Sequence, residues 1–318
     1  QRAAVRRGRR LGTGALVTGA LETGALVVVG HGTKSERGAA AFLSFVDRVQ
    51  ELAPELSVAG GFLELSDPPL REAVAALVSR GHQRVAVVPL VLVAAGHAKG
   101  DVPAAMLRET LRHPGLTYAY GRPLGPHPEL LSVLDDRVDA VLPREMRPGT
   151  AVVLVGRGST DPDGNADIAK TARLFFEGRE FSMVEPAFVS LADPSVPAAL
   201  ERCRLLGARR IVVLPYLLFD GVLPDRVVAQ AEDFAAAHPS LDVRTAPLLG
   251  IDDRIVRLVL ERYAEAVAGD VRMSCDTCMY RAPLVGFEHR VGAPQTPHDH
   301  PSDPSHAHDH DHLHHDAP

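Results

Sequence analysis

The sequence predicts an α/β protein built from two copies of one domain, each a parallel sheet with helices on both of its faces. Three observations support this fold class. Short apolar runs such as Leu26 to Val29 are typical of strands that are buried on both faces. Segments of helical length and periodicity separate these runs, which is the alternation that gives parallel sheets. The same succession then returns in the second half of the chain.

The first half supplies its elements in a regular order. Asp67 is a good N-cap and Pro68 a good first helical residue, so we expect a helix to begin there. The expected order is strand 26–29, helix 37–53, strand 58–65, helix 68–81, strand 85–93, a helix ending near 112, strand 116–120 and helix 128–142. The last helix of the second half is expected at 252–268.

Four anchors align the second half with the first at a nearly constant shift. Arg157 follows an apolar run as His31 does, 126 positions later (157 − 31). Ser190 lies opposite Glu64 at the same shift. The remaining anchors are Pro215 opposite Pro89 and, after one deleted residue, Gly250 opposite Gly125. We therefore infer a duplicated domain, with the boundary between its copies near 148–149.

Composition narrows the class of protein. A chain of 318 residues is long enough for about two domains, and its 46% hydrophobic and 23% charged residues are typical of globular proteins. The arginine cluster near the start is short and lacks interleaved aromatic residues, so no nucleic-acid partner is expected. No apolar run approaches membrane-spanning length, so no membrane partner is expected. Three cysteines favour a reducing compartment, and we expect a cytoplasmic protein.

The polar residues at the strand ends distinguish the two halves. The first half carries His31, Glu64 and His97 at three of these positions. The second half carries Arg157, Ser190 and Val222 at the equivalent places. Since the ends of parallel strands meet at one edge of a sheet, the first three side chains can converge. Two imidazoles and a carboxylate suit a divalent transition metal with open coordination positions, and imidazole also accepts protons near neutral pH.

Each of these residues also has a plainer explanation. A single histidine in a glycine-rich loop is more often solvated than functional, and Glu64 could simply interact with the dipole of the following helix. Asp101 could cap the helix after it. Lys34, Arg37 and Lys99 lie near the same edge and are candidates to meet an anionic ligand, although such side chains usually face water. The loop at 30–35 lacks the glycine spacing of a phosphate or dinucleotide loop, which argues against a nucleotide enzyme.

The C-terminal end carries two further metal-binding signals. Cys275 and Cys278 form a Cys-x-x-Cys pair, which is incomplete because a closed zinc site or a cubane cluster generally takes four ligands. A cluster shared between two subunits, a redox pair, or ligation completed by histidines of the tail are all compatible with it. The tail alternates His with Asp, cannot bury a core, and is expected to be disordered while storing divalent metal loosely. Its candidate ligands are His306, His308, His310, His312, His314 and His315.

The motifs around His31, Glu64 and His97 resemble those of the sirohydrochlorin chelatases of the CbiX and SirB type, across roughly 26–268. The double length, the degenerate second half, the Met-x-Cys-x-x-Cys element and the His-rich end resemble the long cobaltochelatase form in particular. This resemblance implies the chelatase fold, two flavodoxin-like domains facing across a cleft. It also implies insertion of Co(II), or in relatives Fe(II), into sirohydrochlorin without ATP, for cobalamin or sirohaem synthesis; Ni(II) is a further possible metal.

The resemblance also assigns roles to residues. His31 and His97 match the two active-site histidines of the family, Glu64 its acidic position, and Asp101 a looser match. The cysteine pair matches the place of an iron–sulfur cluster. Lys34, Arg37, Lys99 and Arg157 are candidates to bind the substrate's carboxylates. The expected partners are sirohydrochlorin and metal ions, with a homodimer possible; a ferrochelatase and a non-enzymatic cobalt or nickel carrier are the alternatives.

These inferences divide the chain into four segments. We expect a disordered N-terminal segment at 1–23, a catalytic repeat at 24–147 and a degenerate repeat at 148–270. The cysteine motif and the tail rich in His and Asp occupy 271–318.

Overall fold

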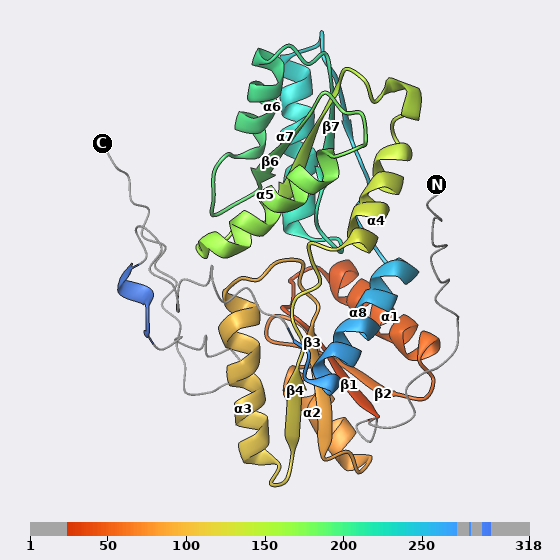
Figure 1. Ribbon diagram of the computed structural model, residues 1–318, viewed down its shortest axis with the longest axis vertical. Coiled ribbons are helices and arrows are strands. Elements are labelled where there is room, and N and C mark those ends of the chain that lie inside the picture. The colour runs from red at the N-terminus through yellow and green to blue at the C-terminus, as the bar shows by residue number, and fades with distance from the viewer. Residues whose placement is uncertain (1–23, 272–279, 281–287, 294–318) are drawn as a thin grey trace, which may run out of the picture.

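The computed structural model describes residues 24–271, 280 and 288–293. It contains two lobes, each with a four-stranded parallel sheet flanked by helices (Figure 1). The strand order is β2-β1-β3-β4 in the first sheet and β6-β5-β7-β8 in the second. The predicted α/β fold with a duplicated parallel-sheet domain is therefore confirmed. Cys275, Cys278 and the tail histidines from His306 to His315 lie outside the described residues.

The first half of the chain contains four strands and the helices between them. In order, the elements are β1 (Ala25–Gly30), α1 (Glu36–Leu52), β2 (Ser57–Phe62), α2 (Leu70–Ser79), β3 (Arg84–Pro89), the π-helix η1 (His97–Asp101), α3 (Val102–Arg112), β4 (Thr117–Tyr120) and α4 (Pro128–Asp139). The strand β1 lies between β2 and β3, and its residues from Ala25 to Val29 are almost completely buried, as the continuous apolar run predicts.

The second half repeats this arrangement. Its elements are η2 (Arg144–Met146), β5 (Thr150–Gly156), α5 (Pro162–Phe176), β6 (Met183–Phe188), α6 (Val196–Leu205), β7 (Arg210–Pro215), α7 (Val222–Ala237), β8 (Asp242–Thr245) and α8 (Asp253–Ala268), followed by η4 (Glu288–Arg290). No helix in the ranges that the structure describes is both long and apolar enough to cross a membrane.

Four expected boundaries are wrong. The strand expected at 58–65 ends at Phe62, and the helix expected at 128–142 ends at Asp139. The helix expected at Pro68 begins at Leu70, with Pro69 as its N-cap. Phe62 N donates a hydrogen bond to Pro68 O, which closes residues 63–67 into a loop before the helix. The strand expected at 85–93 ends at Pro89. Beyond it, the chain leaves the sheet toward the second lobe, where Ala94 N donates to Asp167 Oδ2 at 3.0 Å.

The last helix of each repeat packs on the other repeat's sheet. Helix α8 packs against α1 and β3 of the first lobe, and α4 packs against α5 and β7 of the second (Figure 1). The chain therefore crosses between the lobes twice within the repeats, at 121–127 after β4 and at 246–252 after β8. The four sequence segments expected above follow the repeats, whereas the lobes in space exchange their final helices.

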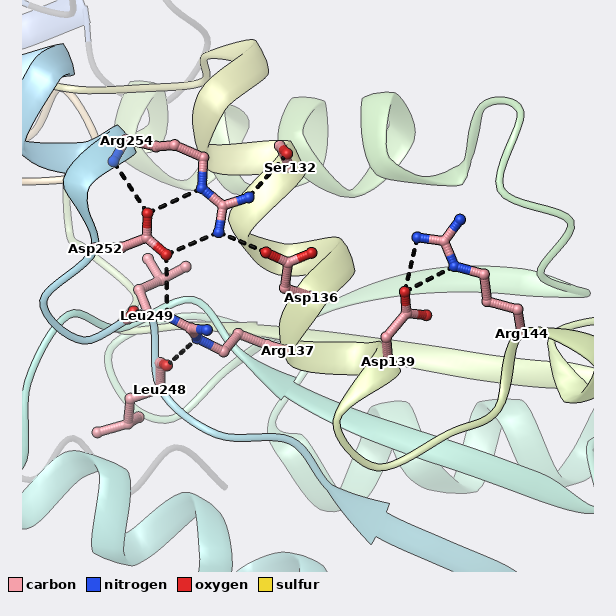
Figure 2. A network of polar contacts seen from close by, with 9 residues as sticks. All are labelled: Ser132, Asp136, Arg137, Asp139, Arg144, Leu248, Leu249, Asp252 and Arg254. Atoms are coloured by element: carbon pink, nitrogen blue, oxygen red, sulfur yellow. Dashed lines mark hydrogen bonds and ion pairs between the residues drawn. The ribbon is translucent and has the colours of Figure 1, made fainter.

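An arginine on each exchanged helix holds one of these crossing segments. Arg262 of α8 donates to Pro123 O at 3.2 Å and to Leu124 O at 2.9 Å. Arg137 of α4 donates to Leu248 O at 2.8 Å and to Leu249 O at 2.6 Å, as Figure 2 shows. The two arginines are equivalent in the duplication (262 − 137 = 125), and so are the carbonyl groups that they hold (248 − 123 = 125).

Ion pairs strengthen the crossing segment that Arg137 holds. The Arg254 guanidinium donates to Asp252 Oδ1 at 2.9 Å, to Ser132 Oγ at 3.0 Å and to Asp136 Oδ2 at 2.5 Å (Figure 2). These contacts join the start of α8 to α4. An arginine side chain thus fixes the backbone carbonyls of both crossing segments, and ion pairs add to the second.

Candidate active site

The loop after β1 brings His31 against Glu64 through its backbone. Gly32 has φ of +108°, and a Cβ atom there would lie 1.7 Å from Glu64 O, so only glycine fits. Glu64 N donates to His31 O at 3.0 Å. Ser66 Oγ donates to Thr33 O at 2.7 Å and accepts from Thr33 N at 3.0 Å. The loops after β1 and β2 are therefore locked together.

The side chains of His31 and Glu64 form the first functional pair. The Nδ1 atom of His31 lies 3.1 Å from Glu64 Oε1, within ion-pair distance but without the alignment of a hydrogen bond. Burial lowers the pKa of His31 to about 4, with smaller contributions in the same direction from His97 and Arg157, while Glu64 raises it. His31 is therefore a neutral imidazole at neutral pH, with a lone pair available to a metal or a proton.

A second histidine–carboxylate pair lies within the π-helix η1. The Nδ1 atom of His97 lies 2.6 Å from Asp101 Oδ2. Asp101 is buried and follows His97 by four positions, at the other end of η1. The Asp101 side chain makes no capping hydrogen bond to α3, so the capping explanation is wrong for this residue. Tyr120 Oη donates to Ala98 O at 2.6 Å and holds η1 against β4.

The two pairs meet at the edge of the first sheet. The ring centres of His31 and His97 lie 4.0 Å apart with an interplanar angle of 49°. Each Nδ1 faces a carboxylate, so each Nε2 lies on the far side of its ring. Since β1 lies beside both β2 and β3, the three strand ends that carry His31, Glu64 and His97 are neighbours.

The second lobe presents a cation to these pairs. Arg157 occupies the position equivalent to His31, and the same backbone supports it: Gly158 has φ of +88° with Ser190 O 1.7 Å from a Cβ there. Ser190 N donates to Arg157 O at 3.0 Å. Burial lowers the pKa of Arg157, while the Glu64 charge raises it, although much of the side chain's surface remains exposed. The backbone is thus kept in both repeats while the side chains differ.

The remaining cationic candidates fall into two groups. Lys34 and Arg37 are exposed near the start of α1, and neither forms an ion pair with any residue that the structure describes. Lys99, the third candidate to meet an anionic ligand, instead has a buried side chain. Its Nζ atom lies 2.8 Å from Asp161 Oδ2 and 2.9 Å from Asp163 Oδ2, and only 7% of its side chain is exposed. Burial lowers the pKa of Lys99, but its hydrogen bonds to the two aspartates outweigh this and raise it.

Sequence reasoning missed Asp161 and Asp163. Both follow Arg157 within six positions, and Asp161 is the N-cap of α5. A capping pattern of this kind predicts a helix start and gives no sign of a cationic partner in the other repeat.

Comparison with known proteins identifies the family. The CbiX family model matches residues 25–141 and again residues 151–266, one match for each repeat. The chain belongs to the CbiX family. Its curated relatives include sirohydrochlorin chelatases.

These CbiX relatives include both cobaltochelatases and ferrochelatases. The sirohydrochlorin cobaltochelatase of Priestia megaterium is 34% identical over 80% of this chain and 84% of its own. The sirohydrochlorin ferrochelatase of Bacillus subtilis is 31% identical over 76% of this chain and 92% of its own. Among solved structures, SirB from Bacillus subtilis with Fe3+ has a TM-score of 0.68 at 29% identity, covering 77% of this chain and 96% of that one. These likenesses assign the chain to the sirohydrochlorin chelatase family.

Proposed function

We propose that this CbiX protein inserts Co(II) into sirohydrochlorin without ATP, with His31 and His97 holding the metal. The observation that carries the proposal is the pair of imidazoles 4.0 Å apart, each with a carboxylate at its Nδ1. A carboxylate at one ring nitrogen fixes the ring's orientation and raises the basicity of the other nitrogen. The two Nε2 atoms are then the natural metal ligands.

An incomplete ligand set suits a metal that is a substrate. Within the described ranges, no group of three or more His, Cys, Asp and Glu side chains is assembled to hold a cation. Two imidazoles leave coordination positions open for water and for the nitrogens of the macrocycle. A metal held by these two imidazoles can therefore be passed on to the macrocycle.

Metal insertion releases two protons from the pyrrole nitrogens, and the histidines are placed to receive them. As each imidazole gives up the metal to the macrocycle, its lone pair becomes available to a proton. Glu64 and Asp101 stabilise the resulting imidazolium ions by their charge. In this proposal Glu64 orients His31, and its role as a direct metal ligand remains a prediction.

Sirohydrochlorin carries many carboxylates, so its binding requires cations around the histidines. Arg157 faces the His31–Glu64 pair from the second lobe, and Lys34 and Arg37 are exposed beside the same loop. Arginine binds carboxylates through two parallel hydrogen bonds. We assign Arg157 to substrate binding, with Lys34 and Arg37 as further contacts.

The choice of Co(II) is supported by the cobaltochelatase relative at 34% identity, and it would place the protein in cobalamin synthesis. The second candidate is a ferrochelatase, supported by the ferrochelatase relative at 31% identity and by the SirB structure with Fe3+. The tail histidines and Cys275 with Cys278 are proposed to store metal or to bind a cluster. A carrier without catalytic activity would use those residues and would not need His31 and His97.

The test is an anaerobic assay of the full chain with sirohydrochlorin and Co(II), Fe(II) or Ni(II), without ATP, followed by the absorption change of the macrocycle. We expect the highest kcat/KM with Co(II). A higher value with Fe(II) would make the protein a ferrochelatase, and metal binding without any insertion would make it a carrier.

Three variants assign the roles in that assay. His31→Ala is expected to abolish insertion, whereas Arg157→Ala is expected mainly to raise KM for sirohydrochlorin. His82→Ala is the matched control, because His82 precedes β3 and lies at the opposite edge of the sheet. Normal turnover by His31→Ala would contradict the assignment.

A further inference from the structure

The π-helix that carries His97 also touches the second lobe. Lys99, two residues after His97, forms ion pairs with Asp161 and Asp163 at the start of α5. Only 7%, 3% and 4% of the three side chains, in that order, are exposed. We call Lys99, Asp161 and Asp163 the interlobe triad.

Two neighbouring contacts place the same segment on α5. Ala94 N donates to Asp167 Oδ2 at 3.0 Å. Gly164 packs so closely that a Cβ there would lie 3.0 Å from Ala95 Cβ. The segment from the end of β3 to η1 is therefore joined to the segment that follows Arg157 by a steric contact, a hydrogen bond and the interlobe triad.

The duplication places a second contact between the lobes, at the start of α1. Gly38 is the equivalent of Gly164 (164 − 38 = 126), and a Cβ on Gly38 would lie 2.3 Å from Asp220 O. Both contacts thus share the close approach at a helix start. The positions equivalent to the interlobe triad hold Pro224, Ser35 and Arg37, which cannot form the same pair of lysine–aspartate contacts.

Burial of three charged groups needs an explanation beyond stability. Desolvation offsets most of the Coulomb attraction in a buried ion pair, so an apolar contact would hold the lobes equally well. The charged groups add a defined geometry, because the lysine ammonium must stay within hydrogen-bond distance of both carboxylates. This geometry connects the segment of His97 to the segment of Arg157.

We propose that Lys99 is a positioning residue, which through Asp161 and Asp163 fixes the distance between His97 in the first lobe and Arg157 in the second. The inference rests on the proposed function, in which the two histidines hold the metal and Arg157 holds a carboxylate of sirohydrochlorin. The macrocycle contacts both lobes, whereas both metal-holding histidines belong to the first lobe. Loss of the interlobe triad therefore affects the macrocycle and leaves the metal in place.

The first variant is Lys99→Met in the full chain, compared with Lys170→Met, which removes an exposed lysine from α5. We expect Lys99→Met to lower kcat/KM for sirohydrochlorin by about tenfold to a hundredfold, because a misplacement near 1 Å can cost about a hundredfold in rate. Its affinity for Co(II) alone, titrated by visible absorption, is expected to equal that of the unaltered protein. An unchanged kcat/KM, or a parallel fall in Co(II) affinity, would overturn the proposal.

Lys99→Met leaves two buried carboxylates without their cation, and the variant could fail to fold for that reason alone. A second variant keeps the test valid in that case. The triple variant Lys99→Met, Asp161→Asn, Asp163→Asn removes every charge, and asparagine preserves the N-cap of α5. We expect it to regain the thermal stability that Lys99→Met loses while kcat/KM for sirohydrochlorin stays low. Recovery of both quantities would show that the ions do not position the lobes.

A readout without turnover separates this inference from the proposed function. Hydrogen–deuterium exchange of the triple variant is expected to be faster than that of the unaltered protein at 94–96 and 157–165, and unchanged at 36–52. The π-helix η1 is expected to keep its place, because Tyr120 and the His97–Asp101 contact hold it within the first lobe. Failure of the unaltered protein to insert metal would refute the proposed function alone. Equal exchange at the two interlobe segments would refute the fixed distance between the lobes, whatever the activity.

Discussion

The imidazole rings of His31 and His97 lie 4.0 Å apart, although 66 positions separate them in the chain (97 − 31). Their proximity follows from the sheet, because β1 and β3 are hydrogen-bonded neighbours that end at the same edge. Each ring then receives its own carboxylate, one from the loop after β2 and one from η1. Predictions about the site therefore concern these supporting residues as much as the histidines.

Glu64→Gln is expected to weaken the site without unfolding it. The substitution preserves size and removes the charge that raises the pKa of His31, so the imidazole becomes a poorer ligand and proton acceptor. Loss of such a supporting carboxylate generally costs about 10- to 100-fold in metal affinity or activity. Co(II) titration and kcat measure the effect, with the exposed Glu72→Gln in α2 as the control. Unchanged values for both quantities would contradict the orienting role.

The stability of the metal-free protein is expected to fall as the pH falls from 6.5 toward 4. The folded-state pKa of His31 lies below its ordinary value, so the unfolded chain binds a proton that the folded protein does not. The contribution of His31 is therefore fully present above pH 6.5 and is lost as the pH drops through that window, by up to about 3 kcal/mol.

The control for this pH dependence is His31→Gln, whose side chain is neutral throughout. Urea unfolding at pH 7 and pH 4.5, with a chelator present, should show a smaller loss of stability for His31→Gln than for the unaltered protein. An identical loss in both would mean that another group accounts for it.

Gly32→Ala is expected to disrupt the active-site loop. The new Cβ would lie 1.7 Å from Glu64 O and would sit on a residue with φ of +108°, so the loops after β1 and β2 must separate. We expect a loss of more than about 3 kcal/mol in the free energy of unfolding, together with loss of activity. Gly81→Ala is the matched control: its φ of +94° is similar, but a Cβ there meets nothing within 4 Å. It should cost about 1–2 kcal/mol, the conformational penalty alone.

Much of the site could be predicted from the sequence, because the residues that mark each strand end are close together in the chain. An apolar run that stops at a glycine marks the place of His31, and the second repeat shows by contrast which side chains are special. Strand adjacency then brings Glu64 and His97 to the same edge.

Lys99 and Asp101 show where such reasoning stops. A lysine in a polar stretch before a helix gives no sign that its partners lie 62 (161 − 99) and 64 (163 − 99) positions away, in the other lobe. Asp101 has the sequence context of a helix cap, yet the π-helix places its carboxylate on His97 instead. The exchange of α4 and α8 is likewise invisible, since an amphipathic pattern shows that a helix is buried and not on which sheet. These features depend on how the two lobes pack together, and the hydrophobic periodicity of a single helix or strand does not show this.

The two arginines that hold the crossing segments are expected to differ in their effect on stability. Arg262 is completely buried, and it also contacts Glu265 Oε1 at 3.0 Å. Arg262→Met therefore leaves Pro123 O and Leu124 O without their donor and should cost about 3 kcal/mol or more, as the loss of a buried cation generally does. The Arg137 side chain is 22% exposed, so water can replace part of its hydrogen bonding, and Arg137→Met should cost about 1–2 kcal/mol.

Turnover separates the arginines' role in stability from a role in the placement of the lobes. Both crossing segments connect a sheet of one lobe to a helix on the other, so loosening either one loosens the relation between His97 and Arg157. At a temperature where both variants are fully folded, we expect each to raise KM for sirohydrochlorin while the affinity for Co(II) is preserved. The exposed Arg257→Met in α8 serves as the control. Two variants that lose stability yet keep the KM of the unaltered protein would show that the crossing segments hold the fold together without setting the geometry of the site.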